Sequence, residues 1–261
     1  MENLIEIKNV HKTFDEKSDF LSPKKEPVYA LKGISLNIKK GEIMGLVGES
    51  GSGKSTLGNC ILKLLNINSG EIFYDGKNLS DFSKDDTKEF RKKTGLIFQN
   101  PYSSLNPKMK IQEILSEPLI AANIKNKRQK KEMLYNIIRL TGLSEDDLGR
   151  YPHEFSGGQR QRIAIARALI LKPEFVVADE PISALDVSIQ AQIINLLIDL
   201  KEKFNLTYLF ISHDLNVVKY LCTRVAIMYR GEIVEMGDVS EIFNNPQHNY
   251  TKLLLSANPG V

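Results

Sequence analysis

The sequence predicts an α/β protein built on a parallel sheet, and three observations support that class. From residue 174 onward, apolar runs of strand length alternate with amphipathic helical segments in the order β-α-β-α-β. Such near-continuous apolar runs are typical of strands buried on both faces by helices. Residues 43–47 form a further run, followed by a glycine-rich stretch and a helical pattern. Residues 4–10 and 34–38 instead alternate apolar and polar positions, which predicts a half-buried β layer near the start of the chain.

Length and composition restrict the class further. The 261 residues, with 42% hydrophobic and 26% charged, fit one large domain or a core with an embedded subdomain. The net charge of +3 is too small for binding driven by a nucleic-acid backbone, so we expect no nucleic-acid partner. Cys60 and Cys222 are too few for a disulfide framework or a zinc knuckle, which favours a reducing compartment.

The sequence contains neither a secretory signal nor a membrane span. The first residues are charged throughout, and no window approaches the roughly 20 apolar residues that cross a bilayer. We therefore expect a cytoplasmic chain that has a membrane role only through a partner. Residues 15–27 are charged and proline-containing, which predicts a surface loop. The basic run at 123–133 lies in a largely helical region, 109–148, and we interpret it as a solvated helix start rather than a partner site.

The glycine-rich stretch is the strongest chemical signal. Residues 48–55 read G-E-S-G-S-G-K-S, which matches the phosphate-loop pattern G-x-x-x-x-G-K-[ST]. A strand before the loop and a helix after it turn backbone N–H groups and a helix N-terminus toward an anion. Lys54 is expected to reach the β- and γ-phosphates, and the Ser55 hydroxyl to ligate Mg²⁺. The expected nucleotide contacts are Gly48, Glu49, Ser50, Gly51, Ser52, Gly53, Lys54, Ser55 and Thr56.

Two carboxylates follow a later apolar run. Residues 175–180 read F-V-V-A-D-E, which places Asp179 and Glu180 at the exposed end of a buried strand. Ligands of open α/β sheets bind at such strand ends. We expect Asp179 to hold Mg²⁺ through water and Glu180 to orient or deprotonate the attacking water as a general base. Without the upstream phosphate loop, the same pair would be interpreted as a strand leaving the core.

A second glycine motif identifies a family. Residues 156–160 read S-G-G-Q-R, and the ordered set around it resembles the motifs of ABC-type ATPases. The other members of the set are Gln99 after the strand 94–98, the pair Asp179 and Glu180, the S-A-L-D stretch at 183–186, His213, and an aromatic residue before the phosphate loop. The resemblance implies a P-loop NTPase (RecA-like) core with an N-terminal antiparallel β layer and an inserted helical subdomain.

The resemblance also implies a division of the single cassette, residues 1–261. Residues 1–97 and 173–240 would form the catalytic core with its β layer, 98–172 the helical and signature subdomain, and 241–261 a C-terminal tail. Independently of the family, two glycines at the start of a helix expose backbone amides, which creates a second anion-binding helix terminus.

The resemblance assigns that second terminus to another subunit. Ser156, Gly157, Gly158 and Gln159 would face the γ-phosphate of ATP bound to a partner, so that two ATP molecules are enclosed head to tail. ATP would then favour the closed dimer, and hydrolysis would remove that bias.

The resemblance implies roles for the remaining motif residues. Gln99 would sense Mg²⁺ and the attacking water, and His213 would contact the γ-phosphate, so the catalytic set is Glu180, His213, Gln99 and Lys54. The Mg²⁺ ligands would be Ser55, Gln99 and Asp179. Ser183 and Asp186 are expected at the dimer interface, although Asp186 also fits the N-cap of the next helix. Phe14 is expected to stack on adenine, with Tyr29 as a competitor. Phe155 replaces the commoner leucine of the signature and should serve as an equivalent apolar anchor.

Three further segments resemble one branch of the family, the oligopeptide, dipeptide and nickel importers. These are residues 98–109, 178–193 and the tail 246–259. The branch implies ATP-driven uptake of short peptides, with nickel or a metal chelate as an alternative and a soluble, non-transport ABC ATPase as a more distant one. It also implies a peripheral location on the cytoplasmic face of the membrane. The implied partners are a second ATPase subunit in a heterodimer or a homodimer, two permease subunits met near residues 98–120, and indirectly a substrate-binding protein. The tail lacks the cysteine cluster of some relatives, so no iron–sulfur site is expected.

Overall fold

The computed structural model describes residues 2–14 and 27–257. The chain divides into two compact units, one formed by residues up to Ser83 together with those from Leu209 onward, and the other by Lys84–Tyr208. Most of the predicted loop at 15–27 and the last residues of the predicted tail at 246–259 lie outside the described residues.

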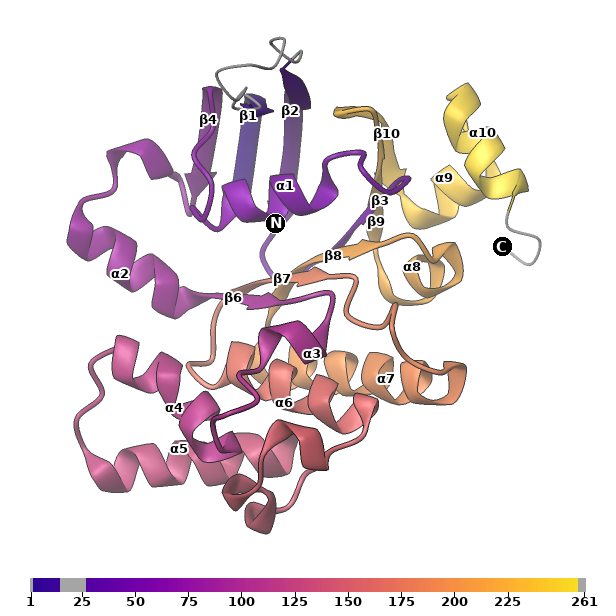
Figure 1. Ribbon diagram of the computed structural model, residues 1–261. Helices are drawn as coiled ribbons and strands as arrows, with labels where there is room; N and C mark the ends of the chain where they lie inside the picture. Colours follow the sequence, from indigo (N-terminus) through magenta and orange to yellow (C-terminus); the bar gives the residue numbers. More distant parts are fainter. Residues whose placement is uncertain (1, 15–26, 258–261) are drawn as a thin grey trace, which may run out of the picture. The chain divides into compact units, whose positions relative to one another are not determined.

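The first unit contains most of the strands (Figure 1). Its elements are β1 (Asn3–Phe14), β2 (Val28–Lys39), β3 (Ile43–Val47), α1 (Lys54–Ile61), β4 (Ser69–Tyr74), β5 (Lys77–Asn78), the 3₁₀ helix η1 (Leu79–Asp81), β8 (Thr207–Ser212, in this unit from Leu209), α8 (Leu215–Leu221), β9 (Arg224–Tyr229), β10 (Glu232–Asp238), α9 (Val239–Asn244) and α10 (Asn249–Ser256).

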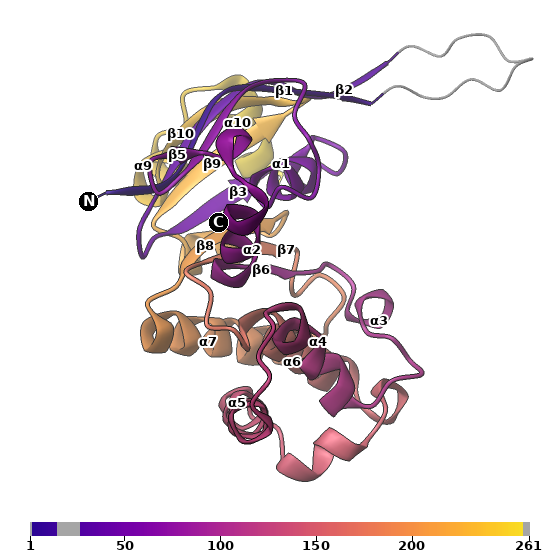
Figure 2. The same cartoon turned by 90° about the vertical axis from the view of Figure 1, so that its left-hand side faces the viewer.

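An antiparallel sheet with the strand order β2-β1-β4-β5 forms the predicted β layer. Strands β1 and β2 run side by side over most of their length (Figures 1 and 2). Their register pairs Ile5 with Ile38 and Ile7 with Leu36, and all four side chains are buried. Because alternate residues of a strand face the same side, this pairing gathers the apolar positions of both strands on one face. The predicted alternation at 4–10 and 34–38 is therefore confirmed, within strands that are longer than the patterns.

The second set of strands in this unit carries the phosphate loop. β3 has parallel β9 on one side and β8 on the other, and β10 continues the sheet antiparallel to β9. All five residues of β3 are buried, as expected for a strand covered on both faces. The helical apolar pattern after the loop extends over residues 54–65, but α1 ends at Ile61, and Lys63 adopts a left-handed backbone with φ 56°.

The second unit is mainly helical (Figure 2). Its elements are α2 (Lys84–Lys93), β6 (Thr94–Ile97), α3 (Pro101–Ser104), α4 (Ile111–Ala121), α5 (Lys127–Leu140), the 3₁₀ helices η2 (Glu145–Gly149) and η3 (Pro152–Glu154), α6 (Gly157–Leu169), β7 (Phe175–Asp179) and α7 (Val187–Phe204).

Helix α6 is central to the packing of the second unit. It contacts α3, α4, α5 and α7, and it buries Ile163, Ile165 and Leu169 completely. Each such side chain contributes about 1.5–3 kcal/mol when it leaves water. The basic run begins α5 as predicted, since Asn126 caps the helix by accepting from the amides of Arg128 and Gln129 and the residues that follow are largely exposed. None of the helices among residues 2–14 and 27–257 is long and apolar enough to cross a bilayer.

Candidate nucleotide site

The phosphate loop joins β3 to α1 and leaves the start of the helix open. Gly53 is the N-cap residue, with φ 107°, a backbone conformation that an L side chain rarely adopts. A glycine at this position has no side-chain oxygen with which to bind the first amides of the helix. The N-terminus of α1 therefore presents backbone N–H groups and the positive end of the helix dipole to a ligand.

The loop is packed closely against neighbouring backbone. A Cβ at Gly48 would overlap the carbonyl oxygen of Met228, and the amide of Gly231 donates to the carbonyl of Ser52 at 3.0 Å. The Ser52 side chain is only 5% exposed, and its hydroxyl has no hydrogen-bond partner within the described part of the chain. A buried hydroxyl without a partner is costly, so the loop suits a ligand rich in acceptor oxygens.

Lys54 lies within this loop and is 5% exposed. Its Nζ donates to the carbonyl oxygens of Gly48, at 2.7 Å, and Glu49, at 2.8 Å. A buried ammonium needs such partners because desolvation of a charge is unfavourable. The loop therefore holds a positive charge at the position where the sequence predicts contact with phosphate.

The first unit also carries the predicted histidine and aromatic residues. His213 directly follows β8 and is exposed, whereas its neighbour Asp214 caps α8 by accepting from the amides of Asn216 and Val217. Phe14 is 37% exposed and Tyr29 is 59% exposed, and they lie on the paired strands β1 and β2. Both rings therefore remain candidates for the adenine.

The second unit carries the predicted carboxylates. The first four residues of β7 are buried, and the strand ends at the half-buried Asp179. Glu180 has a left-handed backbone with φ 44°, which is unfavourable for a residue other than glycine. Its carbonyl oxygen accepts from the amide of Ser183 at 3.3 Å and from the Ser183 hydroxyl at 3.1 Å. A strained residue held by a turn at the end of a buried strand is typical of a functional site.

Gln99 and Glu180 are brought together although they are 81 positions apart. The Gln99 amide nitrogen, Nε2, donates to Oε2 of Glu180 at 2.9 Å. This pairing follows from the sheet, because β6 and β7 are parallel with Ile97 opposite Ala178, so residues after both strands meet at one edge. The bond fixes one carboxylate oxygen of Glu180.

The S-G-G-Q signature begins α6. Ser156 is the N-cap, and it forms a reciprocal capping box with Gln159: the Ser156 amide donates to Oε1 of Gln159 at 3.0 Å, and the Gln159 amide donates to the Ser156 hydroxyl at 3.4 Å. Gly157 and Gly158 are the first two residues of the helix. Phe155 is 4% exposed, so the structure confirms it as an apolar anchor.

The S-A-L-D stretch lies between Glu180 and α7. Ser183 and Asp186 are both exposed. Asp186 occupies the N-cap position of α7, but its side chain makes no capping hydrogen bond there. The carboxylate is therefore not needed to cap the helix.

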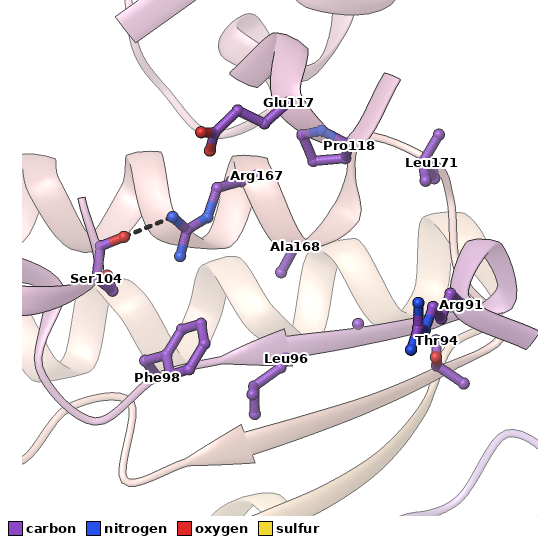
Figure 3. A pocket seen from close by; sticks show the side chains of 11 residues that line it. Arg91, Thr94, Leu96, Phe98, Ser104, Glu117, Pro118, Arg167, Ala168 and Leu171 are labelled. Atoms are coloured by element: carbon purple, nitrogen blue, oxygen red, sulfur yellow. Dashed lines mark hydrogen bonds between the residues drawn. The ribbon is translucent and has the colours of Figure 1, made fainter. Parts of the chain in front are cut away.

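A cavity of about 600 Å³ lies in the second unit (Figure 3). Its lining includes Phe98 after β6, Glu117 on α4 and Arg167 on α6. Arg167 donates to the carbonyl of Ser104, and its guanidinium lies 5.7 Å from the centre of the Phe98 ring. Burial lowers the pKa of Arg167, and the negative charge of Glu117 partly offsets that effect. The cavity thus combines an aromatic ring, a half-buried guanidinium and an exposed carboxylate.

Tyr250, a residue at the phosphate loop, was not predicted from the sequence. The hydroxyl of Tyr250 on α10 accepts a hydrogen bond from the Glu49 amide at 3.2 Å, across 201 positions of sequence. The resemblance of the tail to one branch was the only signal that marked this segment.

The described residues contain no group of three or more His, Cys, Asp and Glu side chains arranged to hold a metal ion. The predicted Mg²⁺ ligands, Ser55 in the first unit and Gln99 and Asp179 in the second, each carry an oxygen donor of the kind that Mg²⁺ prefers.

A phosphate loop between a parallel strand and a helix, together with carboxylates at a strand end, defines the chain as a P-loop nucleotide-binding protein. Residues 31–183 match the model of the ABC transporter family. The chain belongs to this family, and it is an ABC-type ATPase.

Similar proteins and solved structures agree with this family membership. The chain is 51% identical to the oligopeptide transport ATP-binding protein OppF of Streptococcus mutans, over 98% of this chain and 82% of that protein. It is 50% identical to the dipeptide transport ATP-binding protein DppF of Lactococcus lactis, over 98% of this chain and 81% of that protein. The ATP-binding cassette MJ0796, solved as a dimer in a post-hydrolysis state with ADP and Pi, has a TM-score of 0.78 and 34% identity, covering 90% of this chain and 98% of that one. These likenesses confirm the predicted fold class.

Proposed function

We propose that this chain is the ATP-hydrolysing motor subunit of an importer of short peptides, in which two subunits dimerise head to tail around two Mg-ATP. Its similarity to transport ATP-binding proteins for oligopeptides and dipeptides supports the cargo class. The observation that carries the enzymatic part is the hydrogen bond between Gln99 and Glu180, because it holds a carboxylate in a defined orientation at a strand end.

The phosphate loop binds the triphosphate in this proposal. The backbone of Gly48–Thr56 surrounds the phosphates, and the Lys54 ammonium contacts the β- and γ-phosphates. Lys54 already lies in the loop, so little reorganisation is needed when the anion arrives. Phe14 stacks on the adenine, with Tyr29 as the competing ring.

Mg²⁺ fits the oxygen donors that the chain supplies. The Ser55 hydroxyl, the Gln99 side-chain oxygen and the Asp179 carboxylate would hold it, since hard cations prefer oxygen ligands. When bound, Mg²⁺ neutralises charge on the β- and γ-phosphate oxygens. The Gln99 amide can donate to Glu180 through its nitrogen while its oxygen faces the metal.

Glu180 acts as the general base of hydrolysis. It accepts a proton as the water oxygen bonds to the γ-phosphorus, and the bond from that phosphorus to the bridging oxygen of ADP breaks. His213 stabilises the γ-phosphate, and Lys54 stabilises charge that develops on the phosphate oxygens. Gln99 keeps the Glu180 carboxylate facing the water.

The signature acts on the ATP of a second subunit. Ser156, Gly157, Gly158 and Gln159 are proposed to contact that γ-phosphate, and Ser183 and Asp186 to lie at the same interface. The first residues of the signature and both interface residues are solvent-accessible in the isolated chain, which supports their use by a partner. The partner is a second ABC ATPase subunit in a heterodimer, with a homodimer as the alternative.

The permease is proposed to bind at the cavity beside Phe98. Phe98, Ser104, Glu117 and Pro118 of its lining belong to residues 98–120, the segment that the family resemblance assigned to permease contact. The mixed aromatic and charged lining suits a docking helix or loop. The chain would then be peripheral on the cytoplasmic face, and a substrate-binding protein would act indirectly through the permease. We also propose that 98–172 serves as the helical subdomain of the cassette.

Glu180→Gln tests the proposed function. The variant should bind ATP normally, lose about 10²- to 10⁴-fold in hydrolysis, and accumulate an ATP-bound dimer in size-exclusion chromatography with ATP. Glu174→Gln, at the opposite end of β7, is the matched control and should hydrolyse ATP normally. Normal hydrolysis by Glu180→Gln would remove Glu180 from its role.

Uptake assays test the cargo. A strain without this chain should lose uptake of labelled short peptides and regain it with the wild type but not with Glu180→Gln. Loss of nickel uptake with intact peptide uptake would replace the peptide proposal with the metal one.

A further inference from the structure

The C-terminal helix α10 contacts the phosphate loop through one side chain. Tyr250 is 7% exposed, and its hydroxyl accepts from the Glu49 amide at 3.2 Å. Its ring stacks on Tyr229 of β9, with ring centres 4.1 Å apart and planes inclined by 29°. In Figure 1, α10 lies on the side of the unit occupied by β10. The stacked ring therefore fixes where the hydroxyl meets the loop.

The Glu49 amide belongs to the same peptide group as the Gly48 carbonyl. In a trans peptide these two groups point in opposite directions, and the described chain has no cis peptide bonds. Lys54 donates to the Gly48 carbonyl from one side, and Tyr250 accepts from the Glu49 amide on the other. The peptide plane is thus held at both ends, once by the phosphate-binding lysine and once by the tail.

The tail is itself anchored ahead of Tyr250. Glu235 on β10 accepts from the amides of Gln247 at 2.7 Å and His248 at 3.0 Å. His248 then caps α10, since its Nδ1 accepts from the Tyr250 amide at 3.1 Å. Burial raises the pKa of Tyr250, the hydrogen bond from the Glu49 amide offsets part of that rise, and the charge of the Glu49 carboxylate adds to it, so the hydroxyl keeps its proton at neutral pH. These contacts hold the phenol in place without nucleotide.

We propose that Tyr250 is a positioning residue for nucleotide binding: its hydroxyl orients the Gly48–Glu49 peptide, and through the Gly48 carbonyl it sets the Lys54 ammonium for the triphosphate. This inference rests on the proposed placing of the phosphates on Gly48–Thr56. A preoriented loop binds its ligand more tightly because less ordering remains to be done on binding. Removal of the hydroxyl should therefore weaken binding of phosphate-bearing ligands and leave the chemical step nearly unchanged.

Tyr250→Phe isolates the hydroxyl from the ring. The variant keeps the ring that stacks on Tyr229 and loses both contacts of the hydroxyl, the one with the Glu49 amide and the one with the Glu49 side chain. By isothermal titration calorimetry, the Kd for ATP and for ADP should rise about two- to tenfold, in keeping with the loss of one hydrogen bond. In steady-state kinetics KM for ATP should rise by a similar factor, while kcat stays within about twofold of wild type. Adenosine, which has no phosphate, should bind equally to both proteins.

Two tyrosine controls separate positioning from packing. Tyr229→Phe removes the hydroxyl of the stacking partner, and Tyr220→Phe removes one from the exposed face of α8, where Tyr220 is 69% exposed. Both should bind ATP as the wild type does. A wild-type Kd for Tyr250→Phe, or an equal loss of adenosine binding, would overturn the inference whatever the stability of the variant.

Lys54→Ala distinguishes the inference from the function on which it rests. If Lys54→Ala binds ATP as tightly as wild type, the proposed phosphate site itself is wrong. If Lys54→Ala loses affinity and Tyr250→Phe does not, the phosphate site stands and the role of the tail is refuted.

Discussion

The two helix N-termini with anion-binding motifs are prepared in different ways. At α1 the cap is a glycine, and the nearby cation Lys54 is bonded to loop carbonyls. At α6 the cap is Ser156, whose hydroxyl and amide are both engaged with Gln159. The first terminus offers its amides directly, whereas the second has satisfied part of its own hydrogen-bonding capacity.

In the proposed dimer, this difference between α1 and α6 would allow bound ATP to act as a switch. A phosphate that approaches α6 competes with the capping box, so we expect α6 to gain less from the anion than α1 does. A weak second contact suits a closure that must be reversed after each turnover, because the ligand's preference for the closed state sets the population shift. Substitutions at the two termini should therefore differ in their effect on ATP affinity.

Lys54→Ala should have the largest effect. It removes the cation of the stronger terminus, so hydrolysis should fall by about 10² or more and ATP affinity should also fall. ATPase assays and calorimetry measure both quantities. Lys63→Ala is the control, since Lys63 also donates to a carbonyl, that of Leu79, but lies outside the loop. Equal effects of the two substitutions would contradict a special role for the loop cation.

Ser156→Ala should have an intermediate effect. Loss of the cap should lower stability by about 0.5–2 kcal/mol, or some 2–4 °C in Tm per kcal/mol. Hydrolysis should fall about tenfold, with ATP affinity close to wild type, because the hydroxyl is proposed to serve the partner's nucleotide. Ser144→Ala removes a similar capping box from η2 and should lower stability without a change in hydrolysis. If Ser156→Ala lost as much ATP affinity as Lys54→Ala, α6 would gain as much from the anion as α1 does, contrary to our expectation.

Glu235→Gln should have the smallest effect, confined to the tail beside the stronger terminus. Burial alone would raise the pKa of Glu235, but the hydrogen bonds from the Gln247 and His248 amides lower it overall. A lowered folded-state pKa means that the ionised carboxylate stabilises the fold above its unfolded pKa of about 4.3, and that this contribution is lost as pH falls through the folded pKa.

Urea unfolding at several pH values measures this contribution. The variant should be less stable than wild type near pH 7, by less than about 1 kcal/mol because the group is partly exposed, and the gap should close below about pH 4. Glu232→Gln on the same strand is the control. If the stability difference between wild type and Glu235→Gln grew as the pH fell, the pKa of Glu235 would not be lowered in the folded state.

Local sequence was sufficient where a motif and its element are adjacent. Residues 43–55 carry strand, loop and helix start within one segment, so apolar pattern and glycine spacing predict both the element order and Lys54. Strand β7 was predicted equally well, because its four apolar residues, which are buried, are followed directly by Asp179. Helix α2 was not predicted, because it buries only Phe90 and its sequence therefore has almost no apolar face. β10 was missed because its burial pattern contains no fully buried position.

The sequence alone determined the chemistry: a loop for phosphates, carboxylates at a strand end and a second helix terminus, each encoded by residues a few positions apart. The tertiary structure decided which distant groups support them. Gln99 reaches Glu180 because parallel strands end at one edge, and Tyr250 reaches Glu49 because α10 folds back across the unit. Periodicity and motif spacing report on neighbours in the chain, whereas a contact across 201 positions depends on how the sheet and its covering helices pack.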